Sequence, residues 1–249
     1  MTAAMVTLPR NEARADAVES NWKSLYKIGG AAALLSVVFF PIQIVVCLMS
    51  PPPDTAIGWF TLFQSNRLVG LLDLDLLLMV DQVLAILIFL ALYVALRRVN
   101  ESFMAIAFAI ALVSAALFIA SNPAFAMLSL SDQYAAAGTE AQRAMFLTAG
   151  QAVLVTWQGS AFQASYLLGS LAPIIISVVM LEDRSRVFNQ STAYMGILAN
   201  VIALGLYVPK VGVYISIFSV VLLWIWYILL ARRLFQLGHG VLSEAPNRS

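Results

Sequence analysis

Charged side chains are scarce in this 249-residue chain: Lys, Arg, Asp and Glu make up 11% of its residues, while hydrophobic residues make up 61%. Soluble domains carry about 25% charged residues. So little charge cannot cover a surface that faces water over this length. The sequence therefore predicts an all-α, polytopic transmembrane helical bundle. The formal net charge of +1 argues against nucleic-acid binding, which needs a basic face, so we expect no nucleic-acid partner.

Cysteine and histidine are each present once, as Cys47 and His239. A single cysteine excludes an internal disulfide and every redox mechanism that uses a pair of thiols. Zinc and haem sites inside membranes need histidine or cysteine ligands, so we expect no cofactor and no metal centre. The sequence also has no glycine-rich phosphate loop and no Gly-x-Ser-x-Gly nucleophile with a histidine partner. We therefore expect that the protein is not an enzyme.

Long apolar runs dominate what is present. About 20 helical residues cross a bilayer, and the runs predict six spans, at residues 25–49, 68–96, 103–120, 146–180, 192–208 and 213–234. The predicted organisation is a polar cytoplasmic segment (1–24), a transmembrane domain (25–235) and a cytoplasmic tail (236–249) that includes His239. The fourth run is too long for a bilayer, at about 52 Å if helical. Either its first turns project as an amphipathic extension, or Gly150 or Gly159 breaks it; we expect the extension, because a seventh full span would place the downstream positive charges outside.

The positive charges predict the orientation. With the N terminus inside, eleven Lys and Arg residues fall on the cytoplasmic side and three on the other. Positive charge concentrates in cytoplasmic loops. We therefore predict six spans with both termini in the cytoplasm, in the cell (plasma) membrane.

Three aspartates, Asp73, Asp75 and Asp81, lie inside the second apolar run. A charge at mid-membrane costs about 3 kcal/mol, so such residues face a protein interior or a cavity. Asp81 falls about 20 Å along the helix, near the midplane. Asp73 is about 80° from Asp81 around the helix, whereas Asp75 is about 160° from Asp73. Because burial disfavours the charged form of a carboxyl, we predict Asp81 as a protonatable or cation-binding group. The alternative is a structural carboxyl bonded to a facing helix.

Amide side chains on other spans, Gln43, Gln158 and Asn200, are predicted to join Asp81 and Asp73 in a polar pocket between helices. Ordinary interhelical bonding is the alternative. The fourth run also carries a stripe of polar and small residues within about 80°: Gln151, Gln158, Ser165, Tyr166, Gly169 and Pro173. This stripe either lines a cavity opposite Asp81 or packs against a helix. Three outer cations are expected to be available to neutralise Asp73 or Asp75: Arg67, Arg143 and Lys210.

The segment 90–103, with Tyr93, Arg97, Asn100 and Ser102, resembles the hairpin of a bacterial membrane family called domain of unknown function 4386. The opening Leu25-Tyr-Lys-Ile-Gly-Gly30 is similar to that family's start. The resemblance covers about residues 24–235 and implies a fold and a membrane location. It carries no activity and no catalytic residue.

Two functions follow as hypotheses. One is small-ligand binding or proton-coupled transport centred on Asp81, with the lipid bilayer and a small molecule or a proton as partners. The other is a non-catalytic membrane scaffold, sensor or partner subunit. The surroundings of Asp81 discriminate between them, because a ligand site needs a cavity at the carboxyl and a structural carboxyl does not.

Overall fold

The computed structural model describes residues 10–240, and the side chains of residues 22–240 except Val213. The described chain is helical and contains no strand. In chain order the elements are α1 (Arg10–Met49), α2 (Ala56–Ser65), α3 (Arg67–Asp73), α4 (Leu76–Leu96), α5 (Glu101–Ser121), α6 (Ala124–Ala136), α7 (Glu140–Trp157), α8 (Ser160–Glu182), α9 (Gln190–Ala203), the 3-10 helix η1 (Leu204–Tyr207) and α10 (Gly212–Gly238).

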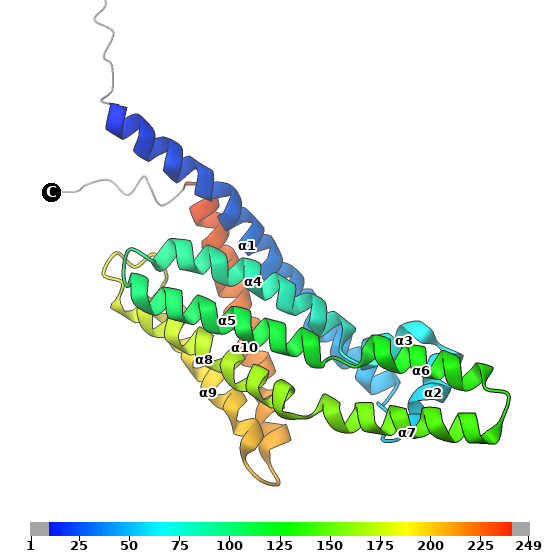
Figure 1. Ribbon diagram of the computed structural model, residues 1–249. Helices are drawn as coiled ribbons and strands as arrows, with labels where there is room; N and C mark the ends of the chain where they lie inside the picture. The colour runs from blue at the N-terminus through cyan, green and yellow to red at the C-terminus, as the bar shows by residue number, and fades with distance from the viewer. Residues whose placement is uncertain (1–9, 241–249) are drawn as a thin grey trace, which may run out of the picture.

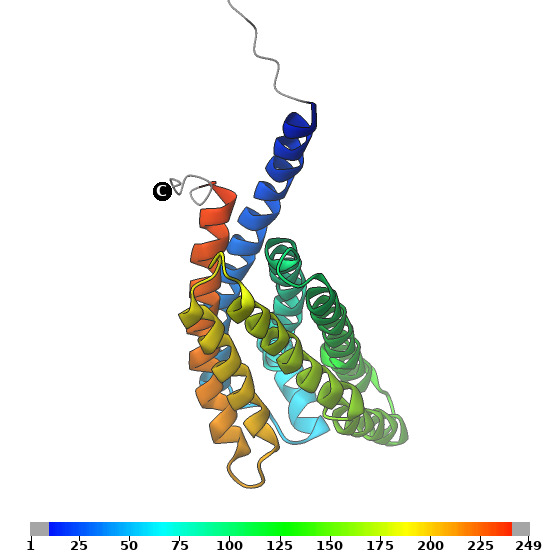
Figure 2. The ribbon, with the colours of Figure 1, turned by 90° about the vertical axis from the view of Figure 1, so that its left-hand side faces the viewer.

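Six helices form a closed ring. Going round it, α1 packs on α4, α4 on α5, α5 on α8, α8 on α9, α9 on α10, and α10 on α1 (Figures 1 and 2). This arrangement confirms the predicted helical bundle. Five described segments are long and apolar enough to cross a membrane: Trp22–Met49, Leu76–Leu96, Glu101–Ala136, Glu140–Glu182 and Tyr214–Gly238. The remaining predicted span corresponds to α9 and η1, which together extend about 29 Å.

Large apolar side chains cover the outside of this ring. Leu48 on α1 is 75% exposed, Phe103 on α5 is 52% exposed and Ile217 on α10 is 60% exposed. Exposed apolar surface on this scale is unfavourable in water, and it suits the hydrocarbon of a bilayer. The chain is a membrane protein.

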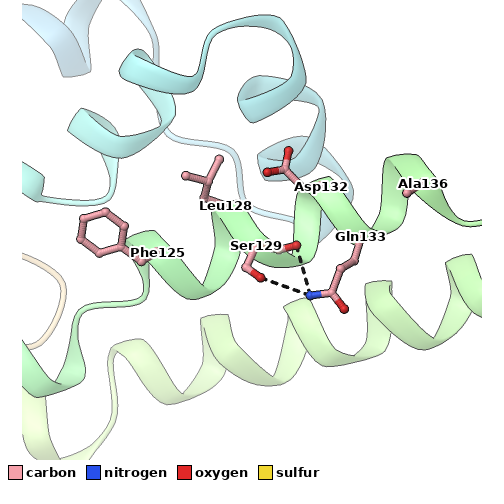
Figure 3. A pocket seen from close by; sticks show the side chains of 6 residues that line it. All are labelled: Phe125, Leu128, Ser129, Asp132, Gln133 and Ala136. Carbon is pink, nitrogen blue, oxygen red and sulfur yellow. Dashed lines mark hydrogen bonds between the residues drawn. The ribbon is translucent and has the colours of Figure 1, made fainter.

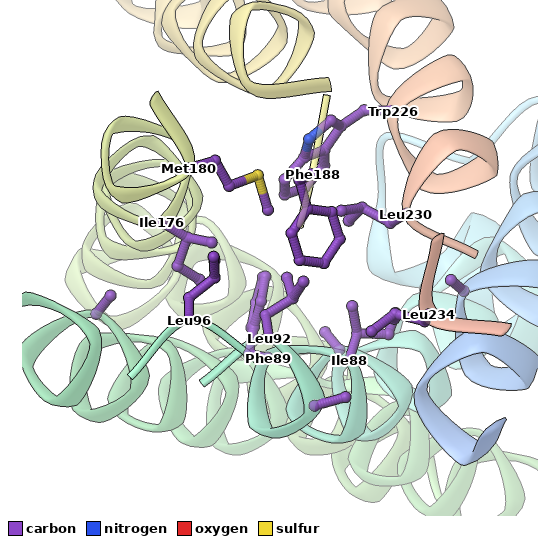
Figure 4. Close-up of a cluster of buried hydrophobic side chains, with 14 of the residues drawn as sticks. Ile88, Phe89, Leu92, Leu96, Ile176, Met180, Phe188, Trp226, Leu230 and Leu234 are labelled. Carbon is purple, nitrogen blue, oxygen red and sulfur yellow. The ribbon is translucent and has the colours of Figure 1, made fainter. Parts of the chain in front are cut away.

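The main core lies between α4, α8 and α10. Leu92 and Leu96 of α4, Ile176 of α8 and Leu230 of α10 point toward one another, and Phe188 enters from the loop before α9 (Figure 4). These side chains are almost fully buried. Both ends of the described chain lie at the same end of the bundle (Figure 1). Helix α10 continues to Gly238, so helix extends into the predicted tail. Residues 1–9 and 241–249 of the predicted terminal segments lie outside the described residues.

A second, smaller core forms a cap at the other end of the bundle, built by α2, α3, α6 and α7. Trp59, Phe60 and Phe63 of α2 are buried there against Met127 of α6. The Trp59 ring meets the Trp157 ring edge-on, with 6.5 Å between centroids. These aromatic contacts hold helices in the segments that follow the first and third predicted spans.

Helices break where the cap meets the bundle. Asn122, between α5 and α6, accepts a hydrogen bond from the Ala124 N–H (3.0 Å) and donates from Nδ2 to the Leu74 carbonyl (2.8 Å), at the break between α3 and α4. The over-long fourth run breaks at Gly159, which precedes α8. Gly150 instead lies inside α7, and a Cβ there would approach Phe60 Cζ to 2.8 Å. The sequence did not decide between these two glycines as the site of a break, and only Gly159 interrupts the helix.

Pro41 inside α1 supports the contact between α1 and α10. Proline has no N–H, so the carbonyl four residues earlier loses its helical donor. That carbonyl belongs to Val37, and it accepts a hydrogen bond from Trp224 Nε1 of α10 at 2.7 Å. The proline thus creates an acceptor that an indole on the neighbouring helix uses.

Gly196 allows α9 to approach α8 and α10 closely, which gives a testable result. A Cβ at this position would lie 2.6 Å from Trp226 Nε1 and in contact with Ser177 Oγ. We expect Gly196→Ala to lower the free energy of unfolding by about 1–3 kcal/mol, the usual cost of overpacking. Unfolding in mixed micelles measures it. The control is Gly138→Ala in the exposed loop before α7, where the nearest atom would be 4.0 Å away. Equal stabilities of the two variants would contradict this packing.

Candidate functional site

A cavity of about 280 Å³ lies inside the helix ring. Every helix of the ring contributes to its wall, with Phe40 of α1, Asp81 of α4, Ser114 of α5, Tyr166 of α8, Asn200 of α9 and Tyr227 of α10. Cavities between the helices of a bundle are a common place for ligand sites. The cavity is therefore the first candidate for a functional site.

Asp81 is the one acidic residue among the side chains that line this cavity. It is 6% exposed, and its Oδ1 atom has no hydrogen-bond partner in the described part of the chain. Ser36 of α1 and Tyr227 of α10 lie near the carboxyl, but no hydrogen bond of normal geometry joins Ser36 Oγ to it. A buried carboxylate without partners is costly. The group therefore either carries a proton or meets a donor or a cation.

The hydroxyl groups on the cavity wall donate to backbone carbonyls. Ser114 Oγ donates to the Ser165 carbonyl (2.7 Å), and Ser170 Oγ donates to the Tyr166 carbonyl (3.1 Å). Ser219 Oγ donates to the Ser216 carbonyl (2.6 Å). A hydroxyl that has used its proton still has acceptor lone pairs. Together with the carboxyl, this makes the polar part of the wall rich in acceptors.

Aromatic rings form much of the remaining wall: Phe40, Phe89, Phe118, Tyr166, Trp226 and Tyr227. None of the described side chains that line the cavity is a lysine, arginine or histidine. A carboxyl and aromatic faces without a neighbouring cation attract positively charged or donor-bearing ligands.

The structure brings some of the predicted pocket residues together and separates others. Asp81 and Asn200 both line the cavity, and so do Ser165, Tyr166 and Gly169 of the predicted stripe. Asn200 is 3% exposed, and its Nδ2 donates to the Gly196 carbonyl at 2.7 Å.

Gln158 is a correction, because it is exposed and lies outside the cavity. The prediction of the stripe assumed one continuous helix, but the chain turns at Gly159 between α7 and α8. Gln151, on α7, is exposed for the same reason.

Gln43 and Asp73 are a second correction. Neither lines the cavity; they lie instead at the contact between α1 and α3. Gln43 Nε2 donates to the Leu72 carbonyl at 3.1 Å. The helix ends at Asp73, and Asp75 follows with φ of 63° at the start of α4. Because of this break, the angle between Asp73 and Asp81 on an ideal helix does not apply.

The outer cations do not neutralise the aspartates of the second run. Arg67 pairs with Asp132 (2.7 Å), and Arg143 pairs with Glu140 (3.0 Å). Lys210 is exposed, in the turn before α10. Among the described residues, no salt bridge reaches Asp73, Asp75 or Asp81.

Ser36 and Tyr227 are neighbours of Asp81 that the sequence did not single out as such. Ser36 and Gln43 are seven residues apart on α1, about 10 Å along the helix. Ser36 therefore lies near Asp81, whereas Gln43 lies at the contact between α1 and α3. Their assignment needed the order of helices round the ring, which no pattern in a single sequence gives.

A second hollow of about 430 Å³ lies on the surface of α6 and is open to the outside. Phe125, Leu128, Ser129, Asp132 and Gln133 line it, and Gln133 Nε2 bonds to Ser129 (Figure 3). Its one acidic residue, Asp132, already pairs with Arg67. We place the candidate site in the cavity inside the helix ring, where the carboxyl of Asp81 is buried and its Oδ1 has no partner among the described residues.

Comparison of the chain with protein-family models, with curated proteins and with solved structures found no match. The family resemblance of the hairpin stays a prediction. The functional argument therefore depends on the geometry of the cavity.

Proposed function

We propose that this membrane protein binds a small, mostly apolar molecule with one positively charged or strongly donating group, inside the helix ring. The observation that carries the proposal is the position of Asp81. It is a buried carboxyl on the wall of a cavity of about 280 Å³, and no described cation pairs with it.

The wall suggests the chemistry of the ligand. A hydrophobic amine places its ammonium at the carboxyl, where charge-assisted hydrogen bonds are strongest. Its apolar body meets aromatic faces such as those of Phe89 and Trp226, which favour cations and apolar groups alike. The cavity volume is close to the lower end of the range for ligand pockets, about 300–1,000 Å³. The ligand is accordingly small.

A carboxyl that exchanges its proton for a bound cation couples the two, and this is the physical basis for transport. In this account Asp81 is protonated without ligand, and releases the proton when the ammonium binds. The proposed location is the plasma membrane, and the lipid bilayer and the small ligand are the partners. No enzymatic step is proposed.

Protection from a carbodiimide tests the proposal. Such reagents modify carboxyl groups in apolar surroundings. In lipid nanodiscs we expect Asp81 to be labelled, and phenethyltrimethylammonium, a cation of similar shape that cannot couple to an activated carboxyl, to reduce that labelling at least several-fold, as read by mass spectrometry. Phenethyl alcohol, which has the same shape without the charge, should protect much less. Asp132, exposed on α6 and paired with Arg67, is the internal control and should stay essentially unlabelled with or without the cation.

Two results would contradict ligand binding at Asp81. One is an absence of labelling under every condition, which would mean a sealed carboxyl. The other is labelling that neither compound changes. Either would favour the alternative, a scaffold or partner subunit in which Asp81 is structural.

A further inference from the structure

Three buried acceptor atoms without partners lie at the contact between α1 and α3, outside the cavity. They are both carboxyl oxygens of Asp73 and Oε1 of Gln43. Asp73 is 2% exposed and Gln43 is 9% exposed, so neither side chain is hydrated in the usual way. Groups of this kind are nearly always bonded in native proteins.

The local hydrogen bonds show which atom of the Gln43 amide has no partner. Its Nε2 donates to the carbonyl of Leu72, the residue before Asp73. Nε2 also lies 3.7 Å from Cys47 Sγ. The amide is thus anchored by its nitrogen, next to Asp73 in the chain, and its oxygen is free to bind something else.

Two further oxygen groups lie close by. Ser50, which follows α1, approaches the Asp73 carboxyl, although no hydrogen bond of normal geometry joins them. Asp75 is near enough to Asp73 for their charges to interact, and it is half-buried. Asp75 begins α4 without capping it through its side chain. The break between α3 and α4 therefore gathers oxygen atoms from α1 and from both sides of the break.

Acceptors cannot satisfy one another. A proton on Asp73 would provide one donor for the three unpartnered atoms, whereas a cation contacts several oxygens at once. Oxygen-only donor sets suit hard cations. Breaks in the helices of membrane proteins are places where sodium is bound, there by backbone carbonyls and helix ends.

We infer that Asp73 and Gln43, at the break between α3 and α4, form a binding site for a hard monovalent cation, sodium. A monovalent ion is favoured because, of the two carboxyls at this break, Asp73 is fully buried and unpartnered, whereas Asp75 is half-buried. The nearest outer cation along the chain, Arg67, is held by Asp132. The site is separate from the Asp81 cavity, so this inference does not depend on the proposed function.

Sodium titration of the wild-type protein in nanodiscs tests the inference. Choline chloride keeps the ionic strength constant, and tryptophan fluorescence and the thermal midpoint are recorded. We expect a saturable sodium-dependent change and a midpoint higher by about 3 °C or more at saturation, because an ion that binds only the folded state stabilises it. Potassium and choline should not reproduce the effect.

Two variants locate the ion. Asp73→Asn removes the carboxylate, and Gln43→Leu removes the amide oxygen while leaving Asp73. Each should abolish the sodium shift or weaken the apparent affinity at least tenfold. Asp54→Asn, on an exposed residue in the loop before α2, should behave like the wild type.

Several results would overturn the inference. They are the absence of a sodium-specific change in the wild type, an equal effect of choline, a shift that calcium produces and sodium does not, and a sodium shift that survives both variants. A wild-type midpoint that depends on pH but not on sodium would mean that a proton fills this place. Because the main readout uses the wild type, a variant that fails to fold does not remove the test.

Discussion

Asparagine in place of Asp81 lowers the affinity of the cavity for phenethylamine by about 10- to 100-fold. Hydrogen bonds to a charged group contribute about 1.5–3 kcal/mol, which is the size of this effect. Asparagine has nearly the same shape, so the cavity keeps its volume and aromatic wall. Binding of phenethyl alcohol should change little. Isothermal titration of the wild type and the variant in the same nanodiscs measures both compounds.

Two control variants separate the charge from the space. Asp132→Asn removes an exposed carboxyl that pairs with Arg67 on the surface, and it should bind both compounds as the wild type does. Ala85→Leu keeps Asp81 but fills part of the cavity that Ala85 lines, and it should weaken both compounds together. If Asp81→Asn binds the amine as tightly as the wild type, the carboxyl is not the polar contact of the site.

Alanine in place of Trp59 destabilises the cap by about 3–5 kcal/mol, the usual cost of removing a buried tryptophan side chain. Trp59 is 1% exposed and lies at the centre of the small core that α2, α6 and α7 share. The cap and the main bundle have different cores. We therefore expect the cap to open before the bundle does.

Hydrogen exchange followed by mass spectrometry measures this prediction. Amides of α2, α6 and α7 should exchange at least tenfold faster in Trp59→Ala, while those of α4 and α10 should stay close to wild type. Phe125→Ala, on a side chain of α6 that is 59% exposed, is the matched control and should change little. Equally faster exchange in all helices would mean that the cap and the bundle unfold as one unit.

The sequence predicted the bundle well because its signals are strong and local. Low charge and long apolar runs leave few alternatives to membrane helices. Asp81 could also be identified, because a carboxyl near the middle of a span is costly wherever the neighbouring helices lie. Asn200 was predicted by the same reasoning about buried polar groups, and it lines the same cavity.

The misplaced residues have a common cause. Gln158 and Asp73 were both placed by counting along a continuous helix, and each lies next to a break. Apolar runs do not reveal such breaks, and at the break before Asp75 the Leu74 carbonyl accepts a hydrogen bond from Asn122, in a distant part of the chain. Tertiary contacts of this kind leave no periodic pattern. The cap was missed similarly, because its aromatic core forms only when α2 meets α6 and α7.

The most direct test of the central claim is a structure of the wild-type protein determined with a bromine-labelled phenethylamine. The account predicts an anomalous bromine peak inside the helix ring, among the aromatic side chains, with the ammonium within hydrogen-bond reach of Asp81. The same peak should be absent in Asp81→Asn at equal ligand concentration. Bromine found only along the lipid-facing helices, or unchanged in the variant, would contradict a ligand site at Asp81.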